Sequence, residues 1–232
     1  MATAMRILAI DSSCGVASAA VVDGLSRLPL ATRSEPMAHG HAEALGPIVE
    51  WTIGQVDGGF SSLGAIAVAV GPGSFTGIRV GLAMARALAL TLELPIVGVS
   101  TLAAFAAPLF ERPRPGVVVA AIDAKHGGVY LQAFESSGAP LFAPRLVSLR
   151  EAAQTIGPGP ARIAGDCAEA LANEGRRAGR AYECVAARYP DIVAIARIGL
   201  ASDPRDCPPR PLYVKPPDAR PRVVEAIANA KR

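Results

Sequence analysis

The stretch Ala65–Ser100, AIAVAVGPGSFTGIRVGLAMARALALTLELPIVGVS, decides the fold class. Its two ends, Ala65–Val70 and Pro95–Val99, are short apolar runs rich in valine, which is typical of strands buried on both faces. Between them, Ser74 is suited to cap the start of a helix that runs to about Glu93. This order predicts a strand–helix–strand unit with a parallel, right-handed crossover. The protein should therefore have an α/β fold.

The predicted helix is unusual because it is apolar around nearly its whole circumference. Gly77, Gly81 and Ala85 lie four residues apart and would form a shallow groove on one face, although a glycine inside a helix costs about 1 kcal/mol relative to alanine. We therefore expect this face to contact another protein; the alternative is a helix enclosed within its own domain. Arg86, near the middle of the helix, argues against a membrane span, where it would cost about 2.5–3.5 kcal/mol.

Composition limits the class of protein. The 232 residues are 51% hydrophobic and 19% charged, which indicates a globular protein of one large domain or two lobes. The net charge of +3 comes mostly from arginine, but no aromatic residues interleave with it as in many RNA-binding surfaces. The four cysteines lack C-x-x-C spacing, and the N-terminus has no signal-peptide pattern. We expect a cytoplasmic protein with reduced thiols and no membrane segment.

The sequence pattern begins again after a linker rich in proline and charge, Glu111–Gly116. Asp11 and Asp123 each follow a predicted strand, 112 residues apart, and Gly15 and Gly127 keep the same offset. The predicted order β-β-β-α-β-α-β-α thus occurs twice, more weakly the second time. Such a repeat indicates an internal duplication.

We predict an N-terminal lobe over residues 1–110 and a smaller C-terminal lobe over 117–232, with a proline-rich tail and a last helix at Val223–Ala230. Duplicated lobes with two acidic hairpins resemble the actin, sugar-kinase and chaperone ATPase superfamily, whose lobes are ribonuclease H-like. In that layout the hairpins contact nucleotide phosphates, and the aspartates hold metal and water.

Asp11, Ser12 and Asp123 are therefore candidate nucleotide-binding residues, with ATP and Mg²⁺ as the ligands. The site is either functional or vestigial. The sequence Asp-Ser-Ser-Cys-Gly matches a glycine-rich phosphate hairpin poorly, and an aspartate at a strand end is also a common turn former.

No complete catalytic or metal-binding motif stands out. Gly71–Ser74, GPGS, precedes a helix but lacks the lysine of a P-loop. His39 and His41 are two residues apart and would point in different directions on a helix, without the H-x-x-x-H spacing of a metal site. No serine or cysteine has a recognisable base partner. The sequence favours a scaffold or partner subunit without catalytic or metal-binding residues.

The chain resembles the TsaB (YeaZ) family of bacterial threonylcarbamoyladenosine biosynthesis. The segments that carry the resemblance are ILAIDSS at Ile7–Ser13, GHAEALGPIVE at Gly40–Glu50, GPGSFTGIRVGLAMARALAL at Gly71–Leu90, VGVSTLAAFA at Val97–Ala106, AIDAKHGGVYLQAF at Ala121–Phe134 and PLYVKPPDA at Pro211–Ala219. The resemblance implies a non-catalytic subunit of the complex that adds the threonylcarbamoyl group to N6 of the adenosine next to the anticodon, in tRNAs that read ANN codons. One departure is Val214-Lys215, where the family more often has leucine-arginine.

The resemblance also implies partners and an interface. In this family the chain pairs with TsaD, a larger catalytic paralogue with metal-binding histidines, and the small ATPase TsaE joins the pair. The tRNA is the substrate of the complex, and family members can also self-associate through a similar surface, so the sequence leaves both a homodimer and a monomer open in isolation. The interface would lie on the helices over His41–Val56 and Ser74–Leu92. The candidate interface residues are His41, Leu45, Gly77, Arg79, Gly81 and Ala85.

Two enzymatic interpretations remain open. A small-molecule kinase or ATPase of the same fold would use Asp11 and Asp123. A metalloprotease would need a ligand spacing that the sequence lacks. As a partner subunit, the chain itself would need no cofactor.

Overall fold

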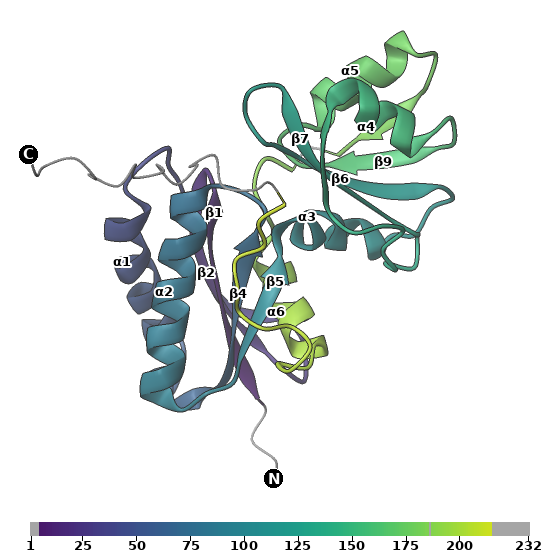
Figure 1. Ribbon diagram of the computed structural model, residues 1–232. Helices are drawn as coiled ribbons and strands as arrows, with labels where there is room; N and C mark the ends of the chain where they lie inside the picture. The colour runs from purple at the N-terminus through teal and green to yellow at the C-terminus, as the bar shows by residue number, and fades with distance from the viewer. Residues whose placement is uncertain (1–4, 186, 215–232) are drawn as a thin grey trace, which may run out of the picture.

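The computed structural model describes residues 5–185 and 187–214 (Figure 1). The helix predicted over Val223–Ala230 lies outside the described residues. Two five-stranded mixed sheets form the frame, with strand orders β3-β2-β1-β4-β5 and β10-β9-β6-β7-β8. The α/β class predicted from the sequence is confirmed.

The first sheet contains the buried strands from which the fold was predicted. Its strands are β1 (Arg6–Cys14), β2 (Val16–Asp23), β3 (Pro29–Pro36), β4 (Leu63–Gly71) and β5 (Ile96–Ser100). The β1–β2 and β2–β3 pairs are antiparallel, whereas β4 runs parallel to both β1 and β5. Nearly every residue of β4 is buried, as expected for a central strand with apolar side chains on both faces.

The second sheet repeats the topology of the first with shorter strands. Its strands are β6 (Val117–Asp123), β7 (Gly128–Phe134), β8 (Arg145–Ser148), β9 (Ala161–Ala164) and β10 (Tyr182–Cys184). The β6–β7 and β7–β8 pairs are antiparallel, and β9 runs parallel to β6 and β10. Each strand thus has a counterpart in the first sheet, which confirms the duplicated architecture.

Six α-helices cover the sheets. They are α1 (His41–Gly54), α2 (Phe75–Leu92), α3 (Thr101–Phe110), α4 (Leu149–Ile156), α5 (Ala168–Arg177) and α6 (Ile192–Ala201), and a short 3-10 helix, η1 (Gly59–Ser62), precedes β4. Hydrogen-bonding caps begin several of them: the Ser74 side chain accepts from the Gly77 N–H at α2, as predicted, and Ser148 with Glu151 forms a capping box at α4.

Helices cover both faces of each sheet (Figure 1). Two of them, α3 and α6, are exchanged: each packs on the sheet formed by the other half of the chain. Helices α1 and α2 lie side by side on one face of the first sheet, and α6 packs on β1 and β2 across the other face. Helices α4 and α5 cover the second sheet, whose other face packs on α3. The division into lobes at residues 111–116 stays a prediction. Packing crosses this position in both directions, since α3 contacts the second sheet and α6 contacts the first.

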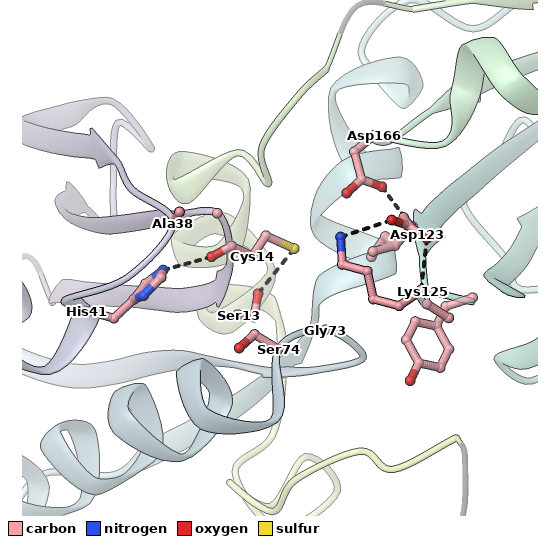
Figure 2. Close-up of a pocket in the computed structure, with 13 residues that line it drawn as sticks. Ser13, Cys14, Ala38, His41, Gly73, Ser74, Asp123, Lys125 and Asp166 are labelled. Carbon is pink, nitrogen blue, oxygen red and sulfur yellow. Dashed lines mark hydrogen bonds and ion pairs between the residues drawn. The ribbon is translucent and has the colours of Figure 1, made fainter. Parts of the chain in front are cut away.

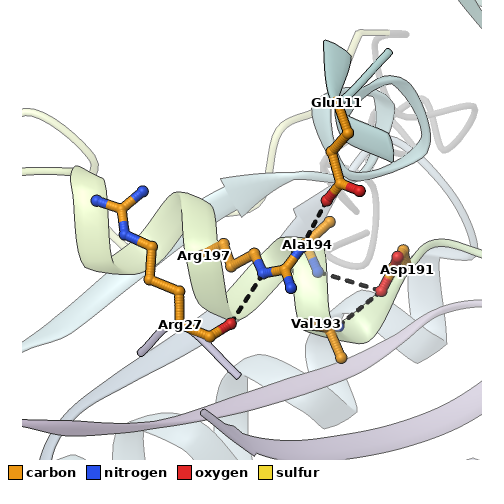
Figure 3. Close-up of polar contacts among 6 residues, drawn as sticks. All are labelled: Arg27, Glu111, Asp191, Val193, Ala194 and Arg197. Carbon is orange, nitrogen blue, oxygen red and sulfur yellow. Dashed lines mark hydrogen bonds and ion pairs between the residues drawn. The ribbon is translucent and has the colours of Figure 1, made fainter. Parts of the chain in front are cut away.

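Polar contacts join the exchanged elements at their ends (Figure 3). Arg197 of α6 donates from Nε to the carbonyl of Arg27, at 3.1 Å, and pairs with Glu111 after α3, at 2.5 Å. Asp191 caps α6 by accepting from the backbone N–H groups of the first turn. One arginine therefore ties α6 to the turn after β2 and to the end of α3.

The segment 203–214, here called the C-terminal strap, runs along the free edge of the first sheet. The N–H of Gly98 in β5 donates to the carbonyl of Cys207, and the N–H of Leu212 donates to the carbonyl of Val70, each at 2.8 Å. Tyr213 at its end stacks on Phe75 with ring centroids 5.6 Å apart. The strap covers backbone groups that an edge strand would otherwise expose.

Helix α2 is, among the described residues, the one helix long and apolar enough to cross a membrane. It packs against β1 and β4, and 33% of its residues are buried. Its place on the first sheet accounts for its buried apolar residues, whereas its outer side stays exposed.

Candidate functional site

A cleft of about 410 Å³ separates the β1–β2 hairpin from the β6–β7 hairpin (Figure 2). The side chains that line it include Ser13, Cys14, His41 and Ser74 from the first half and Asp123, Lys125, Tyr130 and Asp166 from the second. The two hairpins therefore face each other, as the sequence repeat predicted. The side chains at their tips differ in what they can offer a ligand.

Asp11 does not reach this cleft. Its side chain is fully buried, and Oδ1 accepts a hydrogen bond of 2.8 Å from the N–H of Ser13. Oδ2 has no hydrogen-bond partner among the described residues. Burial raises the pKa of Asp11 above its ordinary value, against the hydrogen bonds from Ser13. The carboxyl group predicted to bind nucleotide is therefore enclosed in the protein interior.

Ser12 is also committed to internal contacts. Its hydroxyl donates to the carbonyl of Gly77 in α2 at 2.8 Å, and the side chain is buried. The next peptide is held as well, because the N–H of Ser74 donates to the carbonyl of Ser13 at 2.7 Å. The first turn of α2 thus closes over the end of β1, and Ser12 cannot contact a ligand in the cleft.

Asp123 lies at the cleft surface but is paired with Lys125. Its carboxylate accepts from the backbone N–H of Lys125 at 2.8 Å and from Nζ at 3.0 Å. Partial burial acts to raise the pKa of Asp123, but the contacts with Lys125 outweigh it and hold the pKa below its usual value. Lys125 and His126 both adopt left-handed backbone conformations, with φ of 64° and 51°. A strained turn therefore holds the lysine over the aspartate.

Asp166 and Lys125 were not predicted as site residues. Asp166 lies just beyond the end of β9, and Asp123 is the last residue of β6. The Asp166 Oδ1 accepts from the backbone N–H of Asp123 at 2.8 Å. Burial raises the pKa of Asp166, and the charge of Asp123 adds to that effect. The signal that could have identified both was their position just beyond the ends of two adjacent parallel strands.

The cleft offers little to a metal ion or a nucleophile. Within residues 5–185 and 187–214, no three histidine, cysteine, aspartate or glutamate residues form a group that could hold a metal. Burial raises the pKa of Cys14 far above its usual value, so the thiol stays neutral. Because Asp11 is enclosed and Asp123 is paired with Lys125, these residues do not fit a Mg²⁺–nucleotide complex.

The small-residue face of α2 points inward, which corrects the groove expected from the sequence. Gly77, Gly81 and Ala85 are buried against β1. A Cβ atom at Gly77 would collide with the carbonyl oxygen of Ser12, and one at Gly81 would lie 2.8 Å from the Ser12 Oγ. The glycines therefore allow the close approach of α2 to its own sheet. For this face, the alternative of a helix enclosed within its domain is the right one.

Two other candidate interface residues also lie away from the outer surface. Leu45 is fully buried in the core beneath α1. His41 lines the cleft, with Nε2 at 3.0 Å from the carbonyl oxygen of Cys14. Arg79 is the candidate that remains exposed, with its guanidinium 3.6 Å from the centroid of the Phe75 ring. An interface on these helices stays a prediction and would combine Arg79 with residues outside the predicted set.

The outer side of α1 and α2 still carries large apolar side chains. Trp51 is 43% exposed, Phe75 49% and Leu90 82%. We call this surface the helical face and define it by the exposed residues Pro47, Trp51, Phe75, Arg79, Ala83, Ala87 and Leu90; Glu43, Glu50 and Arg86 are also exposed on these two helices. The sequence predicted an apolar surface on these helices, and Arg79 is the one of these residues that was among the candidates.

Known proteins resemble both the sequence and the fold. The family model described as "TsaD: tRNA N6-adenosine threonylcarbamoyltransferase" matches residues 35–184. The tRNA threonylcarbamoyladenosine biosynthesis protein TsaB of Escherichia coli K12 is 38% identical over 127 residues, which are 54% of this chain and 53% of that protein. The chain belongs to the TsaB/YeaZ family. It spans about half the length of the first curated TsaB relatives that it matches.

Other similar proteins align with more of this chain. An uncharacterized protein of Mycobacterium tuberculosis is 30% identical over 94% of this chain and 95% of its own length. The structure of YeaZ from Pseudomonas aeruginosa superposes with a TM-score of 0.71 and 23% identity, over 90% of this chain and 99% of that one. A polyphosphate/ATP-glucomannokinase from Arthrobacter gives a TM-score of 0.51 at 10% identity, covering 86% of this chain and 98% of that one. These two likenesses show the fold that the family shares with sugar kinases.

Proposed function

We propose that this chain is a non-catalytic partner subunit in the biosynthesis of threonylcarbamoyladenosine in tRNA. The observation that carries the proposal is membership of the TsaB/YeaZ family, whose E. coli relative bears that pathway in its name. The modified base would be the adenosine next to the anticodon in tRNAs that read ANN codons. The catalytic partner would be a TsaD-like paralogue, joined by a TsaE-like ATPase.

The state of the cleft supports a non-catalytic role. Asp11 is buried and Ser12 is bonded to α2, so neither can act on a substrate in the cleft. Asp123 is neutralised by Lys125. A kinase or ATPase that used Asp11 and Asp123 would need at least the first carboxylate to reach the cleft. We therefore favour the partner subunit over this alternative.

The helical face is the surface that we propose for the partner. Protein interfaces are enriched in tryptophan, other aromatic residues and arginine, and Trp51, Phe75 and Arg79 are all exposed there. In isolation the same face would support a homodimer. The TsaD-like paralogue would then compete with a second copy of this chain for it.

Light scattering after size exclusion tests this proposal directly. Ala83→Arg puts a long cation on the exposed side of α2, whereas Ala143→Arg makes the same change on an exposed loop of the second half. We expect the wild type and Ala143→Arg to form a 1:1 complex with the TsaD-like paralogue. Ala83→Arg should bind at least about tenfold more weakly, because the cation must be desolvated in an apolar interface.

Circular dichroism serves as the control that Ala83→Arg is folded. If the folded variant bound the paralogue as well as wild type, the helical face would be the wrong surface. If the wild type itself formed no complex, the partner-subunit proposal would fail.

A further inference from the structure

A hollow of about 320 Å³ lies between residues of α4 and α5. These two helices cover the outer side of the second sheet (Figure 1). Three arginines line it, Arg150 from α4, Arg177 from α5 and Arg180 just after α5, together with a single carboxylate, Glu174. Glu174 pairs with Arg177 at 3.2 Å. The hollow therefore holds an excess of positive charge that the neighbouring acidic residues do not neutralise.

Helix stability does not account for all three arginines. A cation is favourable near the carboxyl end of a helix and unfavourable near the amino end. Arg177, the last residue of α5, fits this rule, but Arg150 lies in the first turn of α4. Among the described residues Arg150 has no ion pair or side-chain hydrogen bond. Its position beside two other guanidinium groups suits an anion that binds all three.

Arg180 is held in place by contacts that leave part of its guanidinium free. Nη1 donates to the carbonyl of Ala153 and lies 3.4 Å from the hydroxyl oxygen of Tyr182. That hydroxyl donates to the carbonyl of Gly157 at 2.7 Å. The Tyr182 ring fits closely over Gly175, where a Cβ atom would lie 2.5 Å from it. The Arg180 side chain is thus positioned before any ligand binds.

We propose that this hollow binds phosphate groups of an RNA backbone. Guanidinium groups match phosphate oxygens in geometry and charge, and an RNA backbone can bring successive phosphates to several guanidinium groups at once. The residues that line the hollow include no aromatic ring on which a base could stack. The contact would therefore position RNA without reading its sequence. That the ligand is RNA, and tRNA in particular, rests on the proposed function.

The hollow and the helical face lie on different halves of the molecule (Figure 1). Helices α4 and α5 cover the second sheet, whereas α1 and α2 cover the first. A partner protein on the helical face would therefore leave the hollow open to tRNA. This chain would then contribute to substrate binding in the complex as well as to its assembly.

Fluorescence anisotropy with a labelled tRNA transcript tests the inference. Arg150→Glu/Arg177→Glu changes two exposed residues of the hollow, and Arg114→Glu/Arg205→Glu makes the same change in charge elsewhere on the surface. We expect the hollow variant to bind at least about tenfold more weakly at 100 mM salt. Its plot of log affinity against log salt should be shallower by roughly 1.4–1.8, at about 0.7–0.9 for each lost phosphate contact. The control pair should stay near wild type.

Equal tRNA affinities for the hollow and control variants would overturn the inference. Inorganic phosphate provides a second arm: if it bound the wild type but not the hollow variant, while tRNA bound neither, the hollow would take a free phosphate and not RNA. Complex formation with the TsaD-like paralogue, measured on the same variants, should be unchanged. If the wild type formed no complex with the paralogue, the proposed function would be contradicted. The tRNA affinities of the hollow and control variants could still be compared.

Discussion

The two hairpins occupy equivalent places in the duplicated fold, yet they have opposite surroundings. Asp11, within β1 near the first hairpin, is fully buried, whereas the Asp123 side chain at the end of β6 is 39% exposed. In the first half, α2 closes over the hairpin because Gly77 allows it to touch Ser12. In the second half, the hairpin tip stays open to the cleft and carries a lysine. One aspartate has become part of the core, while its counterpart has remained at the surface.

Because of this difference, the repeat in sequence does not place two equivalent carboxylates at the cleft. Nucleotide chemistry in such a cleft needs charged groups that face the ligand from both sides. Here the first side presents His41 and small side chains but no carboxylate, and the second presents the Asp123–Lys125 ion pair together with Asp166. The comparison can be tested by changing the residues that set each environment.

The largest effect is expected where α2 meets β1. Gly77→Ala places a methyl group against the Ser12 carbonyl and should lower the free energy of unfolding by about 3 kcal/mol, even though alanine favours the helix. Gly127→Ala in the second hairpin meets no atom within 4 Å. Its cost should be about 1 kcal/mol, from the left-handed backbone at φ 79°. Urea unfolding measures both.

The comparison of hairpins would be wrong if Gly77→Ala cost less than Gly127→Ala. Such a result would mean that α2 moves away from β1 without loss of packing. The cleft side of the first hairpin would then be able to open.

A gain in stability is expected from Asp11→Asn. Asn keeps the acceptor for the Ser13 N–H and removes a buried carboxyl whose pKa is raised by burial. We expect the free energy of unfolding at pH 7 to rise by about 1–3 kcal/mol, since an unpartnered buried charge costs more than an unpartnered amide.

The pH dependence of that gain follows from the direction of the shift. A carboxyl whose pKa is higher in the folded protein stabilises it fully below the unfolded value of about 3.9, and this contribution is lost as pH rises through the folded pKa. The advantage of Asp11→Asn should therefore be largest near neutral pH and shrink toward pH 4 in thermal or urea unfolding. A wild type more stable than the variant at pH 7 would indicate that Asp11 has a charged partner in the native protein.

The sequence was sufficient for the parts of the fold that depend on local pattern. The valine-rich run in β4, the Ser74 cap and the 112-residue repeat all correspond to elements of the structure. The exchange of α3 and α6 was not predicted, because an apolar helix does not encode which sheet it will cover. For the same reason the spacing of Gly77 and Gly81 revealed a close approach but not its direction.

The candidate site was harder to predict because burial depends on tertiary contacts. Asp11 and Asp123 are indistinguishable as residues that follow a strand. Their environments diverge through α2, which is 18 residues long, whereas its counterpart α5 has 10 residues. Lys125 was visible in the sequence, but its pairing with Asp123 depends on the left-handed turn that it adopts.

The smallest effect is expected from Asp123→Asn. The ion pair with Lys125 is largely exposed, and such pairs contribute about 0–1 kcal/mol, so the free energy of unfolding at pH 7 should fall by no more than about 0.5 kcal/mol. Because the folded pKa of Asp123 is lowered, its contribution is present above the unfolded value of about 3.9 and is lost as pH falls through the folded pKa. The small loss of stability should thus vanish in acid, as the gain from Asp11→Asn does, but the two variants should differ from wild type with opposite signs at pH 7. Urea unfolding between pH 3 and pH 7 measures both trends. A loss well above 1 kcal/mol would show that Asp123 is held as firmly as Asp11, and the contrast between an enclosed and an open hairpin would no longer stand.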